Sequence, residues 1–432
     1  MDPATAGFFY YWPDVGACFL ADVFLQVGRY NGRYFSALVR DVKNRMLTVK
    51  IVVDENMPYA QALFSQLGDV VALPGRAIGA EDIQDADALL VRSVTHVNHA
   101  LIKDAKQLRF VGSATAGEDH LDFDALQAQG VYATAAPGCN KVGVAEYVIS
   151  ALLVLAQQQA FKLTDRTVGI VGVGHVGSYL ADRLAALGIK TLLCDPPRQA
   201  RENRADMVDI DTLIAQSDVV TFHTPLTSTG EHPTHHLMNH ARLNALAPGS
   251  ILINAARGPI VDNQALKTRL ARGDMDAVLD VYEHEPEVDL ALVERLTFAT
   301  PHIAGYGLEG KARGTTMVFN ALCQHLSLPQ RADAADLLPT APIPSVQLAA
   351  PWQQTDLMAL TQLVYDIRRD DSDFRRAMTQ AGENKPAQRT AFDQLRKNYW
   401  DRREYSAITV AGHADFGLQS LAKLGFSIEE HA

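Results

Sequence analysis

Three short segments, each following an apolar stretch typical of a strand, carry side chains that could act together on one substrate. Arg257 stands in the first segment, Glu285 in the second and His302 in the third. A guanidinium can bind a carboxylate in a fork and polarise a reacting oxygen. An imidazole can accept a hydroxyl proton, while a neighbouring carboxylate orients the ring and stabilises its protonated form. The set suits hydride removal from a 2-hydroxy acid, although each residue taken singly is more often structural.

A glycine-rich turn supplies the other half of such chemistry. The run Gly172-Val173-Gly174-His175-Val176-Gly177 follows a predicted strand over 167–171 and precedes a predicted helix over 178–187. The first glycine permits a tight turn, the second lets the backbone approach a pyrophosphate, and the third lets helix and strand pack closely. Free N–H groups at the helix N-terminus favour the anion. The pattern predicts a dinucleotide site formed by Gly172, Gly174, Val176 and Gly177.

Asp195 indicates which dinucleotide binds there. It ends a predicted strand over 191–194, 18 residues past Gly177. An acidic residue at this place in a dinucleotide fold binds the adenosine ribose hydroxyls, and its charge repels a 2′-phosphate. The sequence therefore predicts NAD rather than NADP, although the nearby Arg198 weakens that preference.

The elements that must position these residues alternate along the chain as strand and helix. Strands are predicted at 48–53, 87–91, 108–112, 167–171, 191–194, 218–222, 250–254, 276–280 and 297–299, with helices that include 60–67 and 144–160. This rhythm indicates parallel sheets with crossover helices, whose chemistry gathers at the carboxyl ends of the strands. The predicted fold class is α/β, with two doubly wound Rossmann-like domains flanking a cleft.

The chain length of 432 residues suggests about three domains. A proline-rich linker at 338–344 precedes the last of them. We expect a substrate-binding domain of residues 46–143 and 304–335, an NAD-binding domain of residues 144–303 and a C-terminal α+β domain of residues 340–432. Residues 1–45 are expected to be a non-native or disordered extension, and a partner-binding tail is the alternative.

Composition excludes several classes of function. The chain has 39 basic and 50 acidic residues, a net charge of −11, which argues against nucleic acid as a partner. Its four cysteines form no C-x-x-C pair, so a disulfide framework and the usual structural zinc spacings are excluded, and a reducing, cytoplasmic location is expected. No stretch approaches the roughly 20 apolar residues of a membrane-spanning helix.

One cluster of histidines and one single histidine are candidates for further sites. His232, His235, His236 and His240 cluster, but no acidic partner has matching spacing. We therefore predict no metal there, and interpret the segment as a solvated loop that runs into a helix. His223, at the end of the strand predicted over 218–222, is expected to line the cofactor cleft.

The order of GxGxxG, Asp195, Ala-Arg-Gly, Asp-Val-x-Glu-x-Glu-Pro and Pro-His-Ile-Ala-Gly resembles the D-isomer-specific 2-hydroxyacid dehydrogenases. In that family the arginine, the glutamate before proline and the histidine are catalytic. The resemblance therefore implies that Arg257, Glu285 and His302 are the catalytic residues. Hydride transfer to NAD needs no metal, so none is expected.

Further segments resemble one branch of that family, which oxidises 4-phospho-D-erythronate to (R)-3-hydroxy-2-oxo-4-phosphobutanoate with NAD in pyridoxal 5′-phosphate (vitamin B6) biosynthesis. They lie at 53–59, 92–95, 114–117, 136–140, 193–198, 309–314, 363–371 and 395–399. The resemblance implies a homodimer formed through the C-terminal domain, which other family members lack. It also implies substrate contacts by Ser93, Thr115 and Tyr306, and NAD contacts by Asp195, Thr224, Asp280 and Gly305.

Two alternative functions stay open beside this one. Another dehydrogenase of the family, of the phosphoglycerate or glyoxylate/hydroxypyruvate type, is the first. A non-enzymatic, NAD-sensing corepressor is the second, and the intact catalytic set counts against it. One departure from the branch is Glu118, which places a negative charge near an anionic ligand unless it points to solvent.

A terminal phosphate on the substrate would require local positive charge in so acidic a chain. Arg92, at the carboxyl end of the strand predicted over 87–91, is the first candidate. Its alternative role is an ion pair with Asp54 or Glu55. An arginine of the C-terminal segment could also reach the phosphate across a dimer; the candidates are Arg368, Arg369, Arg402 and Arg403. The default expectation for these arginines is a solvated face on which they pair with neighbouring aspartates.

Overall fold

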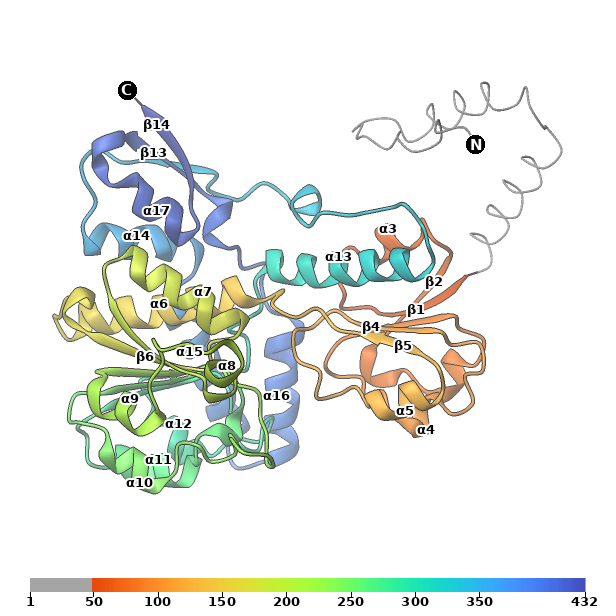
Figure 1. The fold of residues 1–432 in the computed structure, drawn as a ribbon, viewed down its shortest axis with the longest axis horizontal. Helices are drawn as coiled ribbons and strands as arrows, with labels where there is room; N and C mark the ends of the chain where they lie inside the picture. Colours follow the sequence, from red (N-terminus) through yellow and green to blue (C-terminus); the bar gives the residue numbers. More distant parts are fainter. Residues whose placement is uncertain (1–48, 432) are drawn as a thin grey trace.

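The structure is a computed structural model that describes residues 49–431 and arranges them around three sheets (Figure 1). The two larger sheets form separate lobes, and the third lies near the C-terminus. All strand ladders in the described part of the chain are parallel, as the alternation of strand and helix predicts. The expectation for residues 1–45 lies outside the described residues.

The first lobe is a five-stranded sheet in the order β2-β1-β3-β4-β5. Its strands are β1 (Lys50–Asp54), β2 (Asp69–Leu73), β3 (Ala88–Val91), β4 (Phe110–Ser113) and β5 (Tyr132–Thr134). One face packs on α3 (Ala60–Phe64) and α13 (Leu308–His325), so a segment from late in the sequence returns to this lobe (Figure 1). The other face is covered by η1 (Gly75–Ala77), η2 (Ala80–Ile83), α4 (His99–Ile102) and α5 (Phe123–Ala128).

The second lobe is a six-stranded sheet in the order β11-β10-β9-β8-β6-β7. Its strands are β6 (Thr167–Val171), β7 (Lys190–Cys194), β8 (Val219–Phe222), β9 (Ile251–Asn254), β10 (Asp276–Leu279) and β11 (Phe298–Ala299). The order reverses direction at β6, which is the switch point where doubly wound sheets bind ligands. The helices of this lobe are η3 (Leu163–Asp165), α7 (His175–Ala186), α8 (Pro196–Glu202), α9 (Ile210–Gln216), α10 (His240–Ala245), η4 (Gly258–Ile260), α11 (Asn263–Leu270) and α12 (Leu290–Val293).

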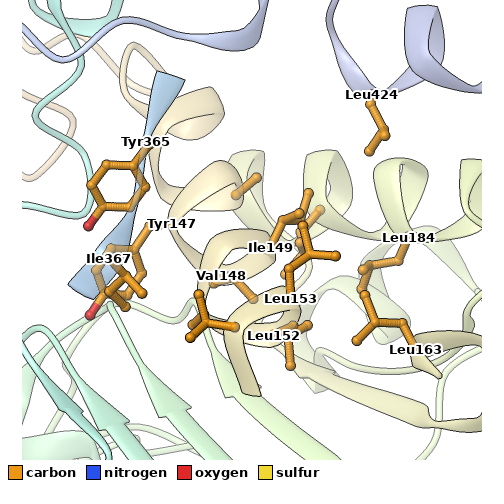
Figure 2. Packing of buried hydrophobic residues seen from close by; sticks show 14 of the residues in the cluster. Tyr147, Val148, Ile149, Leu152, Leu153, Leu163, Leu184, Tyr365, Ile367 and Leu424 are labelled. Carbon is orange, nitrogen blue, oxygen red and sulfur yellow. The ribbon is translucent and has the colours of Figure 1, made fainter. Parts of the chain in front are cut away.

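Helix α6 (Lys141–Gln158) leads from the first lobe into the second and is buried along most of its length. Figure 2 shows its apolar side chains packed towards Leu163, Leu184 and Leu424, which come from three different elements. A helix that is apolar on all sides needs such surroundings, because it has no face to offer to water. None of the helices between residues 49 and 431 combines the length and hydropathy required to cross a bilayer.

The C-terminal segment contacts both lobes. After η5 (Ala335–Leu337), it forms a small sheet of β12 (Ser345–Gln347), β13 (Thr409–His413) and β14 (Ser427–His431), together with α14 (Gln354–Val364), η6 (Tyr405–Ala407), η7 (Ala414–Phe416) and α17 (Leu418–Leu424). Helix α15 (Ile367–Ala381) packs beside β11, and α16 (Lys385–Lys397) stands between the two lobes (Figure 1). Helix α16 reaches the first lobe through Arg76, whose Nη2 is 2.8 Å from Asp393 Oδ1. It reaches the second lobe through Gln388, whose Oε1 accepts a hydrogen bond of 3.2 Å from Val288 N.

Candidate active site

A cavity of about 530 Å³ lies between the lobes, where carboxyl ends of strands from both sheets meet. The structure brings to it every residue predicted as catalytic or substrate-binding, namely Arg92, Ser93, Thr115, Arg257, Glu285, His302 and Tyr306. Gly305, predicted to contact NAD, lines it as well. Ser93 is exposed, and Thr115 is held by a 2.8 Å contact between its Oγ1 and Ser113 Oγ.

His302 and Glu285 form the closest pair in the cavity. The distance between His302 Nδ1 and Glu285 Oε1 is 2.5 Å, so the second ring nitrogen, Nε2, is left for exchange of a proton with a substrate. Burial alone would raise the pKa of Glu285. The facing His302 and a hydrogen bond from Tyr282 N lower it by more than burial raises it, so the pKa lies below its usual value. Glu285 is therefore a carboxylate that can stabilise a protonated imidazole.

Asp280 holds the loop that carries His302. Its Oδ1 accepts hydrogen bonds from Thr300 Oγ1 at 2.7 Å and Ile303 N at 2.8 Å, and its Oδ2 accepts one from Ala304 N at 2.9 Å. His302 itself has a left-handed backbone, with φ of 57°, and its N–H donates to Asp280 O at 2.7 Å. These bonds fix the direction of the imidazole. The predicted contact of Asp280 with NAD stays a prediction.

Arg257 is paired across the cleft with Asp119, which follows β4 in the first lobe. Arg257 Nε and Nη2 lie 3.0 Å and 2.7 Å from Asp119 Oδ2, while Nη1 donates to Ala256 O at 2.9 Å. The guanidinium thus already binds a carboxylate presented from the substrate side of the cavity. Sequence reasoning singled out the adjacent Glu118 instead, and that side chain is exposed to solvent.

The glycine turn has the shape that a dinucleotide requires. Gly172 has φ of 88°, and a Cβ built there would lie 2.7 Å from the His223 backbone. A Cβ on Gly177 would lie 2.0 Å from Gly172 O, so close packing of helix α7 on β6 demands glycine. A Cβ on Gly174 would instead meet nothing within 4 Å, which leaves open space at the N-terminus of α7 for a pyrophosphate.

The side chains around this turn also fit a nucleotide. Asp195 follows β7 and is half-buried, and its Oδ2 accepts a hydrogen bond of 2.8 Å from Val173 N. The guanidinium of Arg198 contacts Val173 O and lies 2.7 Å from Ser178 Oγ. Thr224 Oγ1 is buried without a hydrogen-bond partner in the described part of the chain, beside the glycine turn. Such an unpartnered hydroxyl suits a bound ligand.

The backbone of His223 lies against the glycine turn, and the expectation that its side chain lines the cofactor cleft stays a prediction. Burial lowers the pKa of His223 to about 3, so the ring is neutral, and its Nδ1 has no hydrogen-bond partner within residues 49–431. The interpretation of residues 232–240 as a solvated loop without an acidic partner is wrong for His236, because its Nε2 lies 2.5 Å from Glu283 Oε1. Among residues 49–431, no three or more His, Cys, Asp or Glu side chains come together so that they could hold a metal ion.

Three basic residues that line the cavity, Arg76, Lys311 and Arg396, were not predicted from the sequence. Arg76 comes from η1, Lys311 from α13 and Arg396 from α16. Arg396 Nε donates to Tyr306 Oη at 3.0 Å. Its place in an amphipathic stretch of mixed charge gave no sign of this role, because only the packing of α16 between the lobes turns it inwards.

The arginines expected to reach the phosphate have other partners within this chain. Arg368 pairs with Asp366, and Arg403 pairs with Glu309 at 2.6 Å. The default of a solvated face is wrong for Arg402, which is fully buried. Burial of this guanidinium is possible because its Nη1 donates to Ala304 O at 3.0 Å and its Nη2 to Gly143 O at 2.7 Å. The remaining arginine, Arg369, lies over the ring of Trp400.

Comparison with known proteins agrees with this geometry. Residues 154–304 match the family model of the D-isomer specific 2-hydroxyacid dehydrogenase NAD binding domain, and residues 337–425 match a model described as a domain of unknown function, DUF3410. The chain is 52% identical over 384 residues to the erythronate-4-phosphate dehydrogenase of Cronobacter sakazakii, covering 89% of this chain and 99% of that protein. It is 50% identical over 382 residues to the corresponding enzyme of Yersinia enterocolitica, covering 88% of this chain and all of that protein.

A solved structure with the same fold is the NAD⁺-bound 3-phosphoglycerate dehydrogenase of Entamoeba histolytica. It is 24% identical, with a TM-score of 0.56, and the match covers 65% of this chain and 96% of that one. About a third of this chain therefore lies outside the shared part. From its sequence identity over nearly the full length of its relatives, this chain belongs to the erythronate-4-phosphate dehydrogenases of the D-isomer-specific 2-hydroxyacid dehydrogenase family, and it contains the NAD-binding domain of that family.

Proposed function

We propose that this protein oxidises 4-phospho-D-erythronate at C2 to (R)-3-hydroxy-2-oxo-4-phosphobutanoate with NAD, as a step of pyridoxal 5′-phosphate biosynthesis. The observation that carries this proposal is the pairing of His302 with Glu285 at 2.5 Å in a cavity that also contains Arg257. Family membership supplies the substrate, because the relatives at about 50% identity are erythronate-4-phosphate dehydrogenases.

The residues of the cavity divide the work as follows. Bound NAD⁺ supplies the acceptor for the hydrogen and electron pair of the C2–H bond. Arg257 binds the substrate carboxylate in its fork and polarises the C2 oxygen. The O–H bond at C2 breaks as the carbonyl forms, and its proton goes to His302 Nε2. Glu285 stabilises the imidazolium that results.

The arrangement of the chain supports a division of roles. We assign substrate binding to residues 46–143 and 304–335, and NAD binding to residues 144–303. Residues 340–432 would form the contact of a homodimer, and the protein would act in the cytoplasm. Ser93, Thr115 and Tyr306 would contact substrate, and Val176, Asp195, Thr224, Asp280 and Gly305 would contact NAD. Light scattering of the purified protein tests the dimer, since a monomer would contradict it.

The test of the activity is a direct assay. Purified protein is mixed with NAD and 4-phospho-D-erythronate, and formation of the reduced cofactor is followed by absorbance. We expect turnover, with a higher kcat/KM than for 3-phosphoglycerate or glycerate. A preference for 3-phosphoglycerate would favour the phosphoglycerate type of dehydrogenase. NAD binding without turnover of any of the three acids would favour a corepressor.

A further inference from the structure

Three cationic side chains surround the ring of Tyr306. The Cζ of Arg92 lies 5.6 Å from the ring centroid, the Nζ of Lys311 5.2 Å, and the Cζ of Arg396 5.4 Å. They come from three distant parts of the chain: the end of β3, helix α13 and helix α16. All three line the cavity that contains His302.

None of these three cations has a carboxylate oxygen within 4.0 Å among residues 49–431. Within the described part of the chain, Arg396 donates one side-chain hydrogen bond, to Tyr306 Oη, and Arg92 Nη1 donates to Asn56 O at 2.8 Å. The ion pair of Arg92 with Asp54 or Glu55 is therefore absent from the described structure. Other cations nearby are paired: Arg76 with Asp393, Arg257 with Asp119, and Lys397 with Glu55.

Placing three unpaired cations together in a half-buried cavity is unfavourable unless an anion compensates them. The effect is visible at Lys311, where burial and the neighbouring Arg92 lower the pKa to about 8, against a smaller opposite effect of Asp401. The net charge of the chain is −11, so excess positive charge at this one place is a local feature. A dianionic group is the ligand that such a cluster would bind best.

We infer that Lys311 and Arg396 complete, with Arg92, a subsite for the terminal phosphate of the substrate, and that Arg396 determines specificity for a phosphorylated acid. This inference rests on the proposed function. It gives the C-terminal segment a part in substrate recognition within a single chain, because α16 brings Arg396 into the cavity. Dehydrogenases that match only about two-thirds of this chain need not have an equivalent residue.

The variant Arg396→Met tests this subsite, because methionine keeps an unbranched apolar stem and removes the charge. A hydrogen bond to a charged group contributes about 1.5–3 kcal/mol, or roughly 10–100-fold in binding. We expect the ratio of kcat/KM for 4-phosphoerythronate to that for unphosphorylated erythronate to fall about 10-fold or more. Arg396→Lys, which keeps the charge, should restore part of the ratio.

Lys397→Met is the matched control, since Lys397 is the next residue on α16, is exposed and is absent from the cavity lining. It should keep the wild-type ratio, and thermal melting should show all three variants folded. An unchanged ratio in Arg396→Met, or equal losses on both substrates, would overturn the inference.

Calorimetric titration with inorganic phosphate separates failure of the subsite from failure of the proposed function. The wild-type protein should bind phosphate more tightly than Arg396→Met and Lys311→Met, whichever acid it oxidises. If the wild type turns over no 4-phosphoerythronate but shows this difference, the function is wrong and the phosphate subsite stands. If phosphate binds equally to all three proteins, the subsite is wrong.

Discussion

The guanidinium of Arg257 is bound by the carboxylate of Asp119, with Nη2 2.7 Å from Oδ2, and the two residues belong to opposite lobes of the cleft. Nε and Nη2 both donate to this one oxygen, so the two donors already lie where an anionic oxygen can bind. A substrate carboxylate entering the cavity would meet the same donors. Asp119 is exposed, whereas Arg257 is also held by the bond that its Nη1 donates to Ala256 O.

Replacing Arg257 with lysine should test the need for the fork. Lysine keeps the charge but presents a point charge in place of planar, paired donors. We expect KM for 4-phosphoerythronate to rise about 10-fold or more, while NAD binding, measured by fluorescence titration, stays at the wild-type level. Arg242→Lys is the control, because Arg242 also pairs with an aspartate, Asp211 at 2.7 Å, but lies outside the cavity. Equal effects in the two variants would contradict the role of Arg257.

Asp195→Ala should relax the preference for NAD over NADP. The carboxylate lies beside the glycine turn, where a 2′-phosphate would be repelled. The measurement is the ratio of kcat/KM with the two cofactors. Asp195 also caps helix α8, so Asp209→Ala, which removes the cap of α9, controls for a loss of helix stability. An identical cofactor ratio in wild type and Asp195→Ala would show that Asp195 does not contact the ribose.

Much of this site could be predicted from the sequence because its signals are local. The glycine turn and Asp195 lie within one strand-helix-strand unit, and Arg257, Glu285 and His302 each follow a buried strand of the second lobe. The strands of that lobe were predicted to within a residue or so, since each is a short apolar run. The edge strands β2 and β5 were not predicted, because edge strands are half exposed and carry a weaker apolar pattern.

The contributions of Asp119, Lys311 and Arg396 could not be predicted, because they depend on tertiary packing. Arg396 lies in an amphipathic helix of mixed charge, which is also the pattern of a solvated face. Only the position of α16 between the lobes places it beside Tyr306. The prediction for Arg402 was wrong in the opposite sense. Its position in a charged run predicted exposure to solvent, but the side chain is buried and donates to the carbonyl groups of residues 143 and 304.

Binding of the phosphorylated substrate should weaken in alkaline solution through Lys311. The pKa of Lys311, lowered to about 8 by burial and by Arg92, means that its charge is present below that pH and is lost above it. A bound dianion favours the charged amine, so KM for 4-phosphoerythronate should rise as pH passes above about 8. Lys311→Arg, which stays charged, should remove the rise. A rise of equal size for unphosphorylated erythronate would assign it to another group.

Glu285→Gln should alter the pH dependence of turnover. The ionised carboxylate faces His302 and favours the protonated ring, whereas the neutral amide cannot. Without that charge the imidazole should stay in its basic form down to lower pH, so the acid limb of the rate profile should move to lower pH. The maximum rate should also fall, because the imidazolium formed in the reaction loses its partner. A rate profile with an unmoved acid limb would separate Glu285 from the proton transfer.

The turnover of His302→Asn compared with His236→Asn tests the central claim most directly. Both histidines lie 2.5 Å from a glutamate oxygen, but only His302 lines the cavity between the lobes. A general base contributes about 10²–10⁴-fold. We predict that His302→Asn loses turnover of 4-phosphoerythronate by that factor while it still binds NAD, and that His236→Asn keeps turnover within about 3-fold of wild type. Wild-type turnover in folded His302→Asn would contradict the assignment of this cavity as the active site.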